Sequence, residues 1–119
     1  MSLVNLTGQR LVLVVPPPAS DPELPASEIV LDPTEPTPTV SQVTEEAGTS
    51  TGDETGVPLA RNYWRDFQNL PVRATNTTFI VGKDVFDSQP LRRDFVRVDT
   101  TDAVPDPGGG TKAFRLIIR

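Results

Sequence analysis

The sequence contains no cysteine and no histidine, and these two absences remove much of the usual chemistry of small proteins. Without them the chain cannot form a disulfide framework, a zinc or iron–sulfur site of the common kinds, a thiol nucleophile or a Ser-His-Asp triad. Carboxylate chemistry remains open, but no motif in the sequence names a reaction. We therefore expect a protein that is not an enzyme and that carries no cofactor and no metal.

Aromatic residues and long apolar runs are also scarce. Every aromatic residue lies between Tyr63 and Phe114, so the first 62 residues have no large ring to anchor a core. The longest apolar run, Leu11 to Val15, has the length of a strand and falls far short of the roughly 20 residues that a membrane span needs. The opening residues lack the basic and apolar regions of a signal peptide. We expect a small core, no membrane segment and synthesis in a cytoplasm.

Positive charge is missing from a long part of the chain. Residues 11–60 contain no lysine or arginine and nine aspartate or glutamate residues, whereas residues 61–119 contain ten basic and seven acidic residues. Because the basic residues are scattered and the formal net charge is −5, nucleic-acid binding is not expected as the main function.

The acidic stretch is also rich in proline, threonine and serine. Such a composition buries too little apolar surface to offset an ordering cost of about 1–2 kcal/mol per residue for the backbone alone. We therefore divide the chain into an N-terminal strand segment (1–15), an acidic extended arm or linker (16–56) and a β-rich body (57–119). The arm is expected to be mobile unless something holds it.

The clearest local pattern lies between Thr78 and Phe95, which hold three of the five phenylalanines between and including them. Thr78 to Val81 is apolar and β-prone, so a strand is expected there. Asp84 is placed to cap a short helical turn that points Val85 and Phe86 inward. This stretch predicts a strand, a helical turn and a second strand, and it is fold information without a catalytic signature.

Other short apolar runs predict further strands. Residues 72–74 and 78–81 are expected to pair as a hairpin, and Trp64 and Phe67 are expected to pack in the core near Leu70. The pattern predicts a mostly β fold, a small β-sandwich or barrel-like body of five to seven short strands with a long extended arm rich in Pro, Thr and Glu. Strands are expected at 11–15, 57–61, 95–98 and 113–118, with weaker ones in the arm at 28–31 and 39–44.

Four stretches form a recognisable set of motifs: Val4–Thr7, Phe79–Gly82, Pro90–Phe95 and the hairpin around residues 108–116. They resemble motifs of a family of small, largely uncharacterised proteins encoded by bacteriophages and bacteria. Members of that family open with Val-Asn-Leu-Thr-Pro-His, whereas Gly8-Gln9 stands here in place of Pro-His. The acidic arm looks like an insertion. The resemblance touches about a third of the chain; it implies a phage-type origin, and it transfers no activity and no functional residue.

Two groups of charged residues are candidate ligand sites. Arg92 and Arg93, with Arg97, are candidates to bind a phosphate or carboxylate through bidentate hydrogen bonds; the alternative is that an arginine pairs with Asp94 to fix a loop. Three aspartates at 99, 102 and 106 have the oxygen chemistry of calcium ligands, but their spacing matches no calcium loop and they are interpreted as solvated turn residues. The glycines at 108–110 lack the features of a phosphate-binding loop and are interpreted as a hinge.

Two functional hypotheses follow. The leading one is a viral structural protein, such as a phage minor capsid, cement or decoration protein, that binds capsid or other virion proteins in many symmetric copies and adds strands to their sheet edges. The alternative is a phage-encoded binding protein in the host cytoplasm, such as a nucleotide-signal sponge or an inhibitor of a defence protein, which would use the arginines and is a candidate homo-oligomer. The residues expected to bind a partner are Leu11, Leu13, Val15, Ile29, Leu31, Val40 and Val43.

Overall fold

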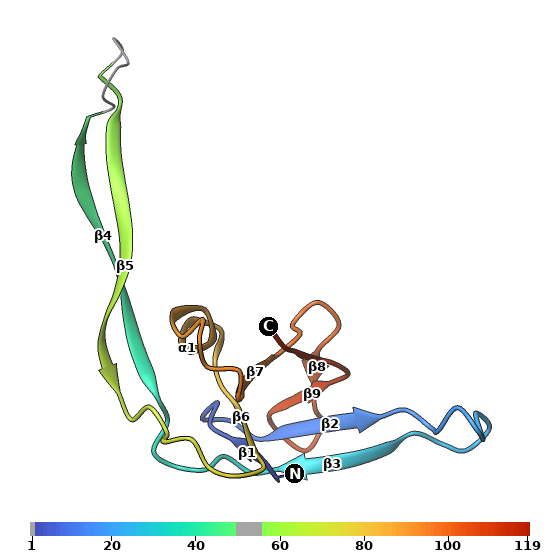
Figure 1. The fold of residues 1–119 in the computed structure, drawn as a ribbon. Coiled ribbons are helices and arrows are strands. Elements are labelled where there is room, and N and C mark those ends of the chain that lie inside the picture. Colours follow the sequence, from blue (N-terminus) through green and yellow to red (C-terminus); the bar gives the residue numbers. More distant parts are fainter. Residues whose placement is uncertain (1, 50–55) are drawn as a thin grey trace.

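Short β-strands dominate the computed structural model, which describes residues 2–49 and 56–119 (Figure 1). The prediction of a mostly β fold is confirmed. The described strands form small open sheets, and their number is greater than the five to seven that the sequence predicts. In chain order the elements are β1 (Ser2–Asn5), β2 (Leu11–Val15), β3 (Ser27–Leu31), β4 (Thr39–Thr49), β5 (Pro58–Gln68), β6 (Thr77–Ile80), α1 (Lys83–Ser88), β7 (Phe95–Val98), β8 (Val104–Pro105), β9 (Thr111–Ala113) and β10 (Leu116–Ile117).

The first sheet has the strand order β1-β6-β7-β10 and is buried on both faces. β6 pairs in parallel with β1 and with β7, and β10 pairs antiparallel with β7. Successive side chains on a strand point to opposite faces. Phe79 and Phe95 therefore share one face, where their rings meet edge to face at 6.2 Å, and α1 covers them with Phe86. Ile80 and Val96 point to the other face.

The second sheet, with the order β3-β2-β9-β8, covers that other face. β2 is an interior strand, antiparallel to β3 and parallel to β9. Its residues Leu11 and Leu13 pack with Ala113 of β9 against Ile80 and Val96. The body is thus a helix, a central sheet and a second sheet in three layers, and its core is small.

A buried asparagine joins the two sheets near the start of the chain. The Asn5 side chain is 1% exposed, and its amide nitrogen donates to the carbonyl oxygens of Gln9 at 2.7 Å and Leu31 at 2.9 Å. Its carbonyl oxygen accepts from the backbone N–H and the hydroxyl of Thr7. Gly8, with φ of 81°, lies in the turn between β1 and β2. The Val4–Thr7 motif therefore has a structural role in this chain.

The predicted hairpin of residues 72–74 with 78–81 is wrong. Residues 72–74 are not in a strand, and β6 pairs with β1 and β7 instead. A turn precedes β6: Asn76 has φ of 53°, and the Thr77 N–H donates to the Ala74 carbonyl. Parallel pairing on both sides lets β6 bury both of its faces, and a local hairpin would not achieve this.

The predicted helical turn is present as α1, with Val85 and Phe86 buried as expected. Its N-cap residue is Gly82, without a side-chain cap, so the expected capping role of Asp84 is wrong. Asp84 lies one position inside the first turn, where its charge favours the positive end of the helix.

Two parts of the acidic segment pair with strands of this same chain. β3 lies along β2, and β4 lies along β5 in a two-stranded ribbon that projects from the body (Figure 1). β5 continues well beyond the short strand predicted at 57–61 and contains Trp64 and Phe67, which the sequence analysis placed in the core. With the ribbon included, the chain measures 64 × 30 × 28 Å. Across residues 2–49 and 56–119, no helix is long and apolar enough to span a membrane.

Candidate protein-interaction surfaces

The ribbon of β4 and β5 projects from the body (Figure 1). Each strand has 11 residues, which corresponds to a length of about 36 Å at roughly 3.3 Å per residue. Within the described residues β4 and β5 pair only with each other, so each strand has an outer edge of unpaired backbone groups. The ribbon therefore presents two long, open strand edges, one on β4 and one on β5.

The two faces of the ribbon carry different side chains. Val43 lies opposite Tyr63 on one face, where Glu45 and Arg61 also face each other with 3.8 Å between their charged groups. On the other face Gln42 lies opposite Trp64, and the Thr44 hydroxyl bonds to the Asn62 side-chain oxygen at 2.6 Å. Tyr63 and Trp64 are half-buried, and most other described ribbon side chains are exposed. Neither face is covered by the body along its length (Figure 1).

The base of the ribbon is fixed to the body. Val40 and Leu70 pack against the core cluster beneath α1, and the Asn69 side chain donates to the Thr37 carbonyl at 3.3 Å. A break in the ladder precedes this base, where Asp66 takes φ of 58° and the register shifts as in a β-bulge. Bulges increase twist, so this one sets the direction in which the ribbon leaves the body.

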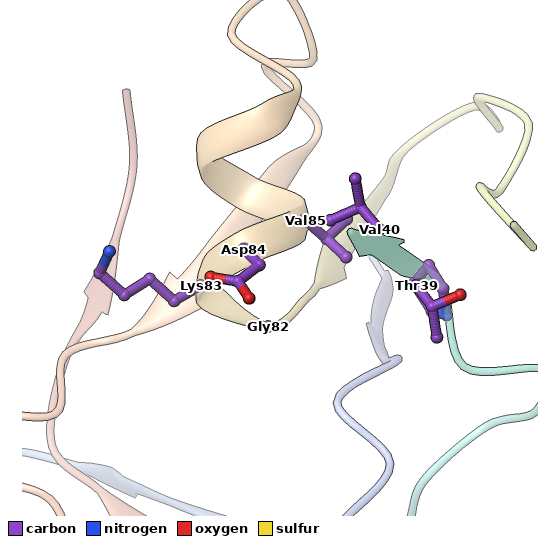
Figure 2. Close-up of a pocket in the computed structure, with 7 residues that line it drawn as sticks. Thr39, Val40, Gly82, Lys83, Asp84 and Val85 are labelled. Atoms are coloured by element: carbon purple, nitrogen blue, oxygen red, sulfur yellow. The ribbon is translucent and has the colours of Figure 1, made fainter. Parts of the chain in front are cut away.

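An open pocket of about 340 Å³ lies at the same base, between β4 and the start of α1 (Figure 2). Thr39 and Val40 line it from β4, and Val85 from the helix lies beside Val40. The Lys83 side chain extends away from Val40, and its ammonium group pairs with Asp87 at 2.8 Å. The described residues that line the pocket thus form no cluster of unpaired charges. The pocket lies where the ribbon joins the body.

A second projection is the hairpin of β2 and β3, which runs away from the body in another direction (Figure 1). Near its root lies a mainly apolar pocket of about 210 Å³. Val15 and Ile29 line it from the hairpin, and Phe114 and Leu116 line it from the C-terminal segment. Val15, Ile29 and Phe114 are more than a third exposed, so apolar surface is open to solvent there.

The seven residues expected to bind a partner are divided by the structure. Leu11 and Leu13 are 1% and 8% exposed in the chain's own core, which corrects the expectation that they contact a partner. The reason is that β2 is paired on both sides and faces Ile80. Leu31 and Val40 are partly buried against the two core clusters, and Val43 is half-buried in the ribbon. Val15 and Ile29 are exposed.

The three candidate anion-binding arginines have separate surroundings. Arg92 makes a bidentate pair with Asp94, with both N–O distances 2.8 Å, and also donates to the Pro71 carbonyl. Its guanidinium lies 4.2 Å from the centre of the Phe95 ring. Hydrogen bonding from Arg92 lowers the pKa of Asp94 below its ordinary value. The structural alternative considered for this motif, an arginine that pairs with Asp94, is therefore what the structure contains.

The other two arginines do not complete an anion pocket with Arg92. Arg93 is exposed and makes no hydrogen bond or ion pair with any described residue. Arg97 lies on β7 with its guanidinium 5.6 Å from the centre of the Phe86 ring, and its Nε atom is buried without a partner among the residues that the structure describes. The Arg119 guanidinium also lies near this ring, 4.0 Å from the centre of Phe86.

The three turn aspartates are also separate. Asp99 accepts from the Thr101 N–H, and this bond lowers the pKa of Asp99. Asp102 lies 3.6 Å from Arg115. Asp106 pairs with Arg10 at 2.8 Å, and hydrogen bonding from Arg10 lowers the pKa of Asp106. Each carboxylate therefore has a separate partner, and the three do not form one site.

The glycine run is not a free hinge. Arg10 donates to the Gly109 carbonyl at 2.8 Å, and the Asp106 carboxylate accepts from the Gly108 N–H. The Thr111 N–H donates to the Arg10 carbonyl. These bonds fix the turn between β8 and β9 against the start of β2. The expectation of a flexible connection is corrected, because Arg10 lies too far away in the sequence for local turn chemistry to indicate this contact.

The sequence predicted strands at 39–44 and 57–61, which overlap β4 and β5, but it did not predict the full length of these strands or their pairing into a ribbon. Its strands are rich in polar and charged residues, which resemble a linker in composition, and neither face has the apolar alternation of a half-buried strand. One feature of the sequence was consistent with this pairing. Arg61 and Arg65 follow the acidic segment, and in the structure Arg61 lies opposite Glu45. Cross-strand pairs of opposite charge favour antiparallel pairing.

Comparisons of the chain with protein-family models, with curated proteins and with solved structures give no match. The fold and its surfaces define a small three-layer β protein from which the β4–β5 ribbon and the far end of the β2–β3 hairpin project. A function has to be inferred from those projections.

Proposed function

We propose that this chain is a structural protein of a virus particle, such as a minor capsid, cement or decoration protein of a bacteriophage. In this role it binds neighbouring shell subunits in many symmetric copies. The observation that carries the proposal is the ribbon of β4 and β5, which projects from the body with two open edges.

The ribbon is a costly feature for a protein that acts alone. A two-stranded ribbon is marginally stable in water, and three or more strands or a covering layer are normally needed. A subunit that adds a strand to β4 or β5 would supply main-chain hydrogen bonds, which give affinity without requiring a deep pocket. Exposed Leu59 and Phe67 on β5 would add apolar contact.

The body and the ribbon would then hold the protein by several modest contacts. Contacts repeated by symmetry raise the overall affinity above that of any single contact. β2, whose residues were expected to contact a partner, cannot add to a partner's sheet because it already has a neighbouring strand on each side. The free edges of β3, β4 and β5 are the ones suited to strand addition.

Particles provide the direct test. Particles would be purified on a density gradient from cells that produce them with this chain, and the copy number of the chain would be measured by quantitative mass spectrometry. The proposal expects a fixed ratio to the shell protein. A chain that stays in the soluble fraction and is missing from the particle band would refute it.

A ribbon variant tests the observation itself. Deleting residues 43–46 together with 60–63 removes four paired residues from each strand and keeps the alternation of faces. We expect the body to fold and particle incorporation to be lost. Arg93→Ala is the matched control, because Arg93 is exposed and unbonded among the described residues, and its incorporation should be unchanged.

A further inference from the structure

The outer edge of β3 is open and lacks the usual protection of an edge strand. In the described part of the chain β3 pairs with β2 alone, over five consecutive residues without a bulge. Natural edge strands are usually guarded by lysine, proline, a bulge or a covering segment. Residues 27–31 contain neither lysine nor proline, and Ile29 and Val30 are 44% and 51% exposed. This edge is therefore regular, apolar in its centre and accessible.

The charge around this edge is mainly negative. Glu28 and Asp32 stand at the two ends of Ile29–Leu31, four residues apart, so they lie on the same side of an extended chain. Asp21, Glu23 and Glu35 lie in the adjoining segments, and residues 11–60 contain no basic residue. Lys112 of β9 pairs with Glu28 at 3.5 Å in a partly exposed ion pair, and Asp32 has no ion pair within the described residues. The edge thus carries one unpaired carboxylate, and a second that an approaching strand would share with Lys112.

The same charges disfavour a second copy of β3 paired so that residues 29–31 of the two copies align. In the symmetric antiparallel register centred on Val30, Glu28 of one copy would lie opposite Asp32 of the other. Like charges directly opposite each other on neighbouring strands are destabilising. A strand of opposite charge has the complementary pattern.

We propose that the β3 edge binds an extended segment of a neighbouring protein in which two lysines or arginines flank three apolar residues. The segment adds a strand to the sheet β3-β2-β9-β8, its apolar residues lie beside Ile29 and Val30, and its cations face Glu28 and Asp32. This inference rests on the proposed assembly function for the presence of a neighbour, and it names the chemistry of that neighbour. The purified chain is sufficient to test it.

The probe is the fluorescent peptide Ala-Lys-Ile-Val-Val-Lys-Ala, titrated with the full chain and followed by fluorescence anisotropy. We expect saturable binding that weakens as salt is raised, because exposed charge pairs are screened. The same peptide with glutamate in place of both lysines should bind about tenfold more weakly or not at all, since attraction is replaced by repulsion at two cross-strand pairs.

Charge reversal on the protein gives the reciprocal test. The double variant Glu28→Lys with Asp32→Lys should lose about tenfold in affinity for the lysine peptide and should gain affinity for the glutamate peptide. The matched control is Glu45→Lys with Glu46→Lys on the ribbon, which makes the same change of net charge away from β3. That control should bind the lysine peptide like the wild type.

Methylation of the peptide's backbone nitrogens distinguishes strand addition from simple charge attraction. A peptide methylated on alternate nitrogens keeps both lysines but can pair through only one of its two edges, and a peptide methylated on every backbone nitrogen from the first lysine to the second cannot form the main-chain ladder at all, so binding of the fully methylated peptide should be lost. Equal binding of the fully methylated peptide, or no binding of the lysine peptide, overturns the proposal. Light scattering gives a third overturning outcome: self-association of the wild type that Val30→Pro on β3 abolishes would make a second copy of this chain the occupant. These results do not depend on whether the chain is found in particles, so failure here is separate from failure of the proposed function.

Discussion

The side-chain amide nitrogen of Asn5 lies 2.9 Å from the backbone carbonyl oxygen of Leu31, and this hydrogen bond links β1 of the central sheet to the edge strand β3. The same nitrogen also bonds to the Gln9 carbonyl. A single fully buried amide therefore satisfies backbone groups from two separate parts of the chain.

The substitution Asn5→Ala should lower the free energy of unfolding by about 2–4 kcal/mol, because it leaves buried backbone groups without partners. Urea unfolding followed by circular dichroism measures this change. Asn62→Ala is the control, since Asn62 is exposed on the ribbon with one side-chain bond, and its effect should stay under about 1 kcal/mol. Equal effects of the two substitutions would contradict the role given to Asn5.

The pair of Arg92 and Asp94 should make stability depend on pH. The pKa of Asp94 is lowered in the folded chain, first of all by the hydrogen bond from Arg92. The stabilisation is therefore fully present above the ordinary aspartate pKa of about 3.9, and it is lost as the pH falls through the lowered value. The substitution Arg92→Met should remove this part of the acid dependence.

At neutral pH we expect Arg92→Met to cost about 2–3 kcal/mol, because the paired side chains are only 15% and 17% exposed and the guanidinium also lies on Phe95. Unfolding curves between pH 2 and 7, compared with those of Arg93→Met, measure both effects. An Arg93→Met curve that changed as much as the Arg92→Met curve would show that the specific pair is not the cause.

The glycines at 109 and 110 provide a matched comparison in one turn. A Cβ on Gly110 would overlap the backbone carbonyl of Arg10, whereas a Cβ on Gly109 would meet open space. Both residues have positive φ, so both substitutions carry conformational strain. Gly110→Ala should cost more than about 3 kcal/mol or prevent folding, and Gly109→Ala about 1 kcal/mol. Thermal unfolding would measure both, and similar melting temperatures for the two variants would be inconsistent with the packing of Arg10.

In the free chain the ribbon should unfold locally more readily than the body does. Amide hydrogen exchange at residues 41–46 and 60–65 should be about two orders of magnitude faster than at Ile80 and Phe95, because no third strand and no covering layer from the described part of the chain protects the ribbon. Trp64, the one tryptophan, reports the same region by fluorescence, and a partner that covers β5 should shift its emission. Equal protection in ribbon and body would mean that the ribbon needs no partner for its stability.

The sequence analysis succeeded where local patterns decide structure. The apolar run at 11–15 forms β2, and the stretch from Thr78 contains β6 and α1 with Phe86 buried. It failed where pairing depends on distant residues: β6 pairs with β1, and no local pattern near Thr77 indicates that neighbour. For the candidate surfaces, exposed Val15 and Ile29 could be predicted, but the burial of Leu11 and Leu13 depends on β9 and on the opposite sheet.

The parallel pairing of β2 with β9 has a consequence for biosynthesis. Leu11 is in register with Thr111, and the bond from Arg10 to Asp106 spans 96 residues, so the second sheet cannot close until almost all of this sequence has left the ribosome. Contacts between such distant residues slow folding, since a large loop must close before they are formed. We expect β2 to remain without one of its native neighbours until residues 111–113 have emerged from the ribosome.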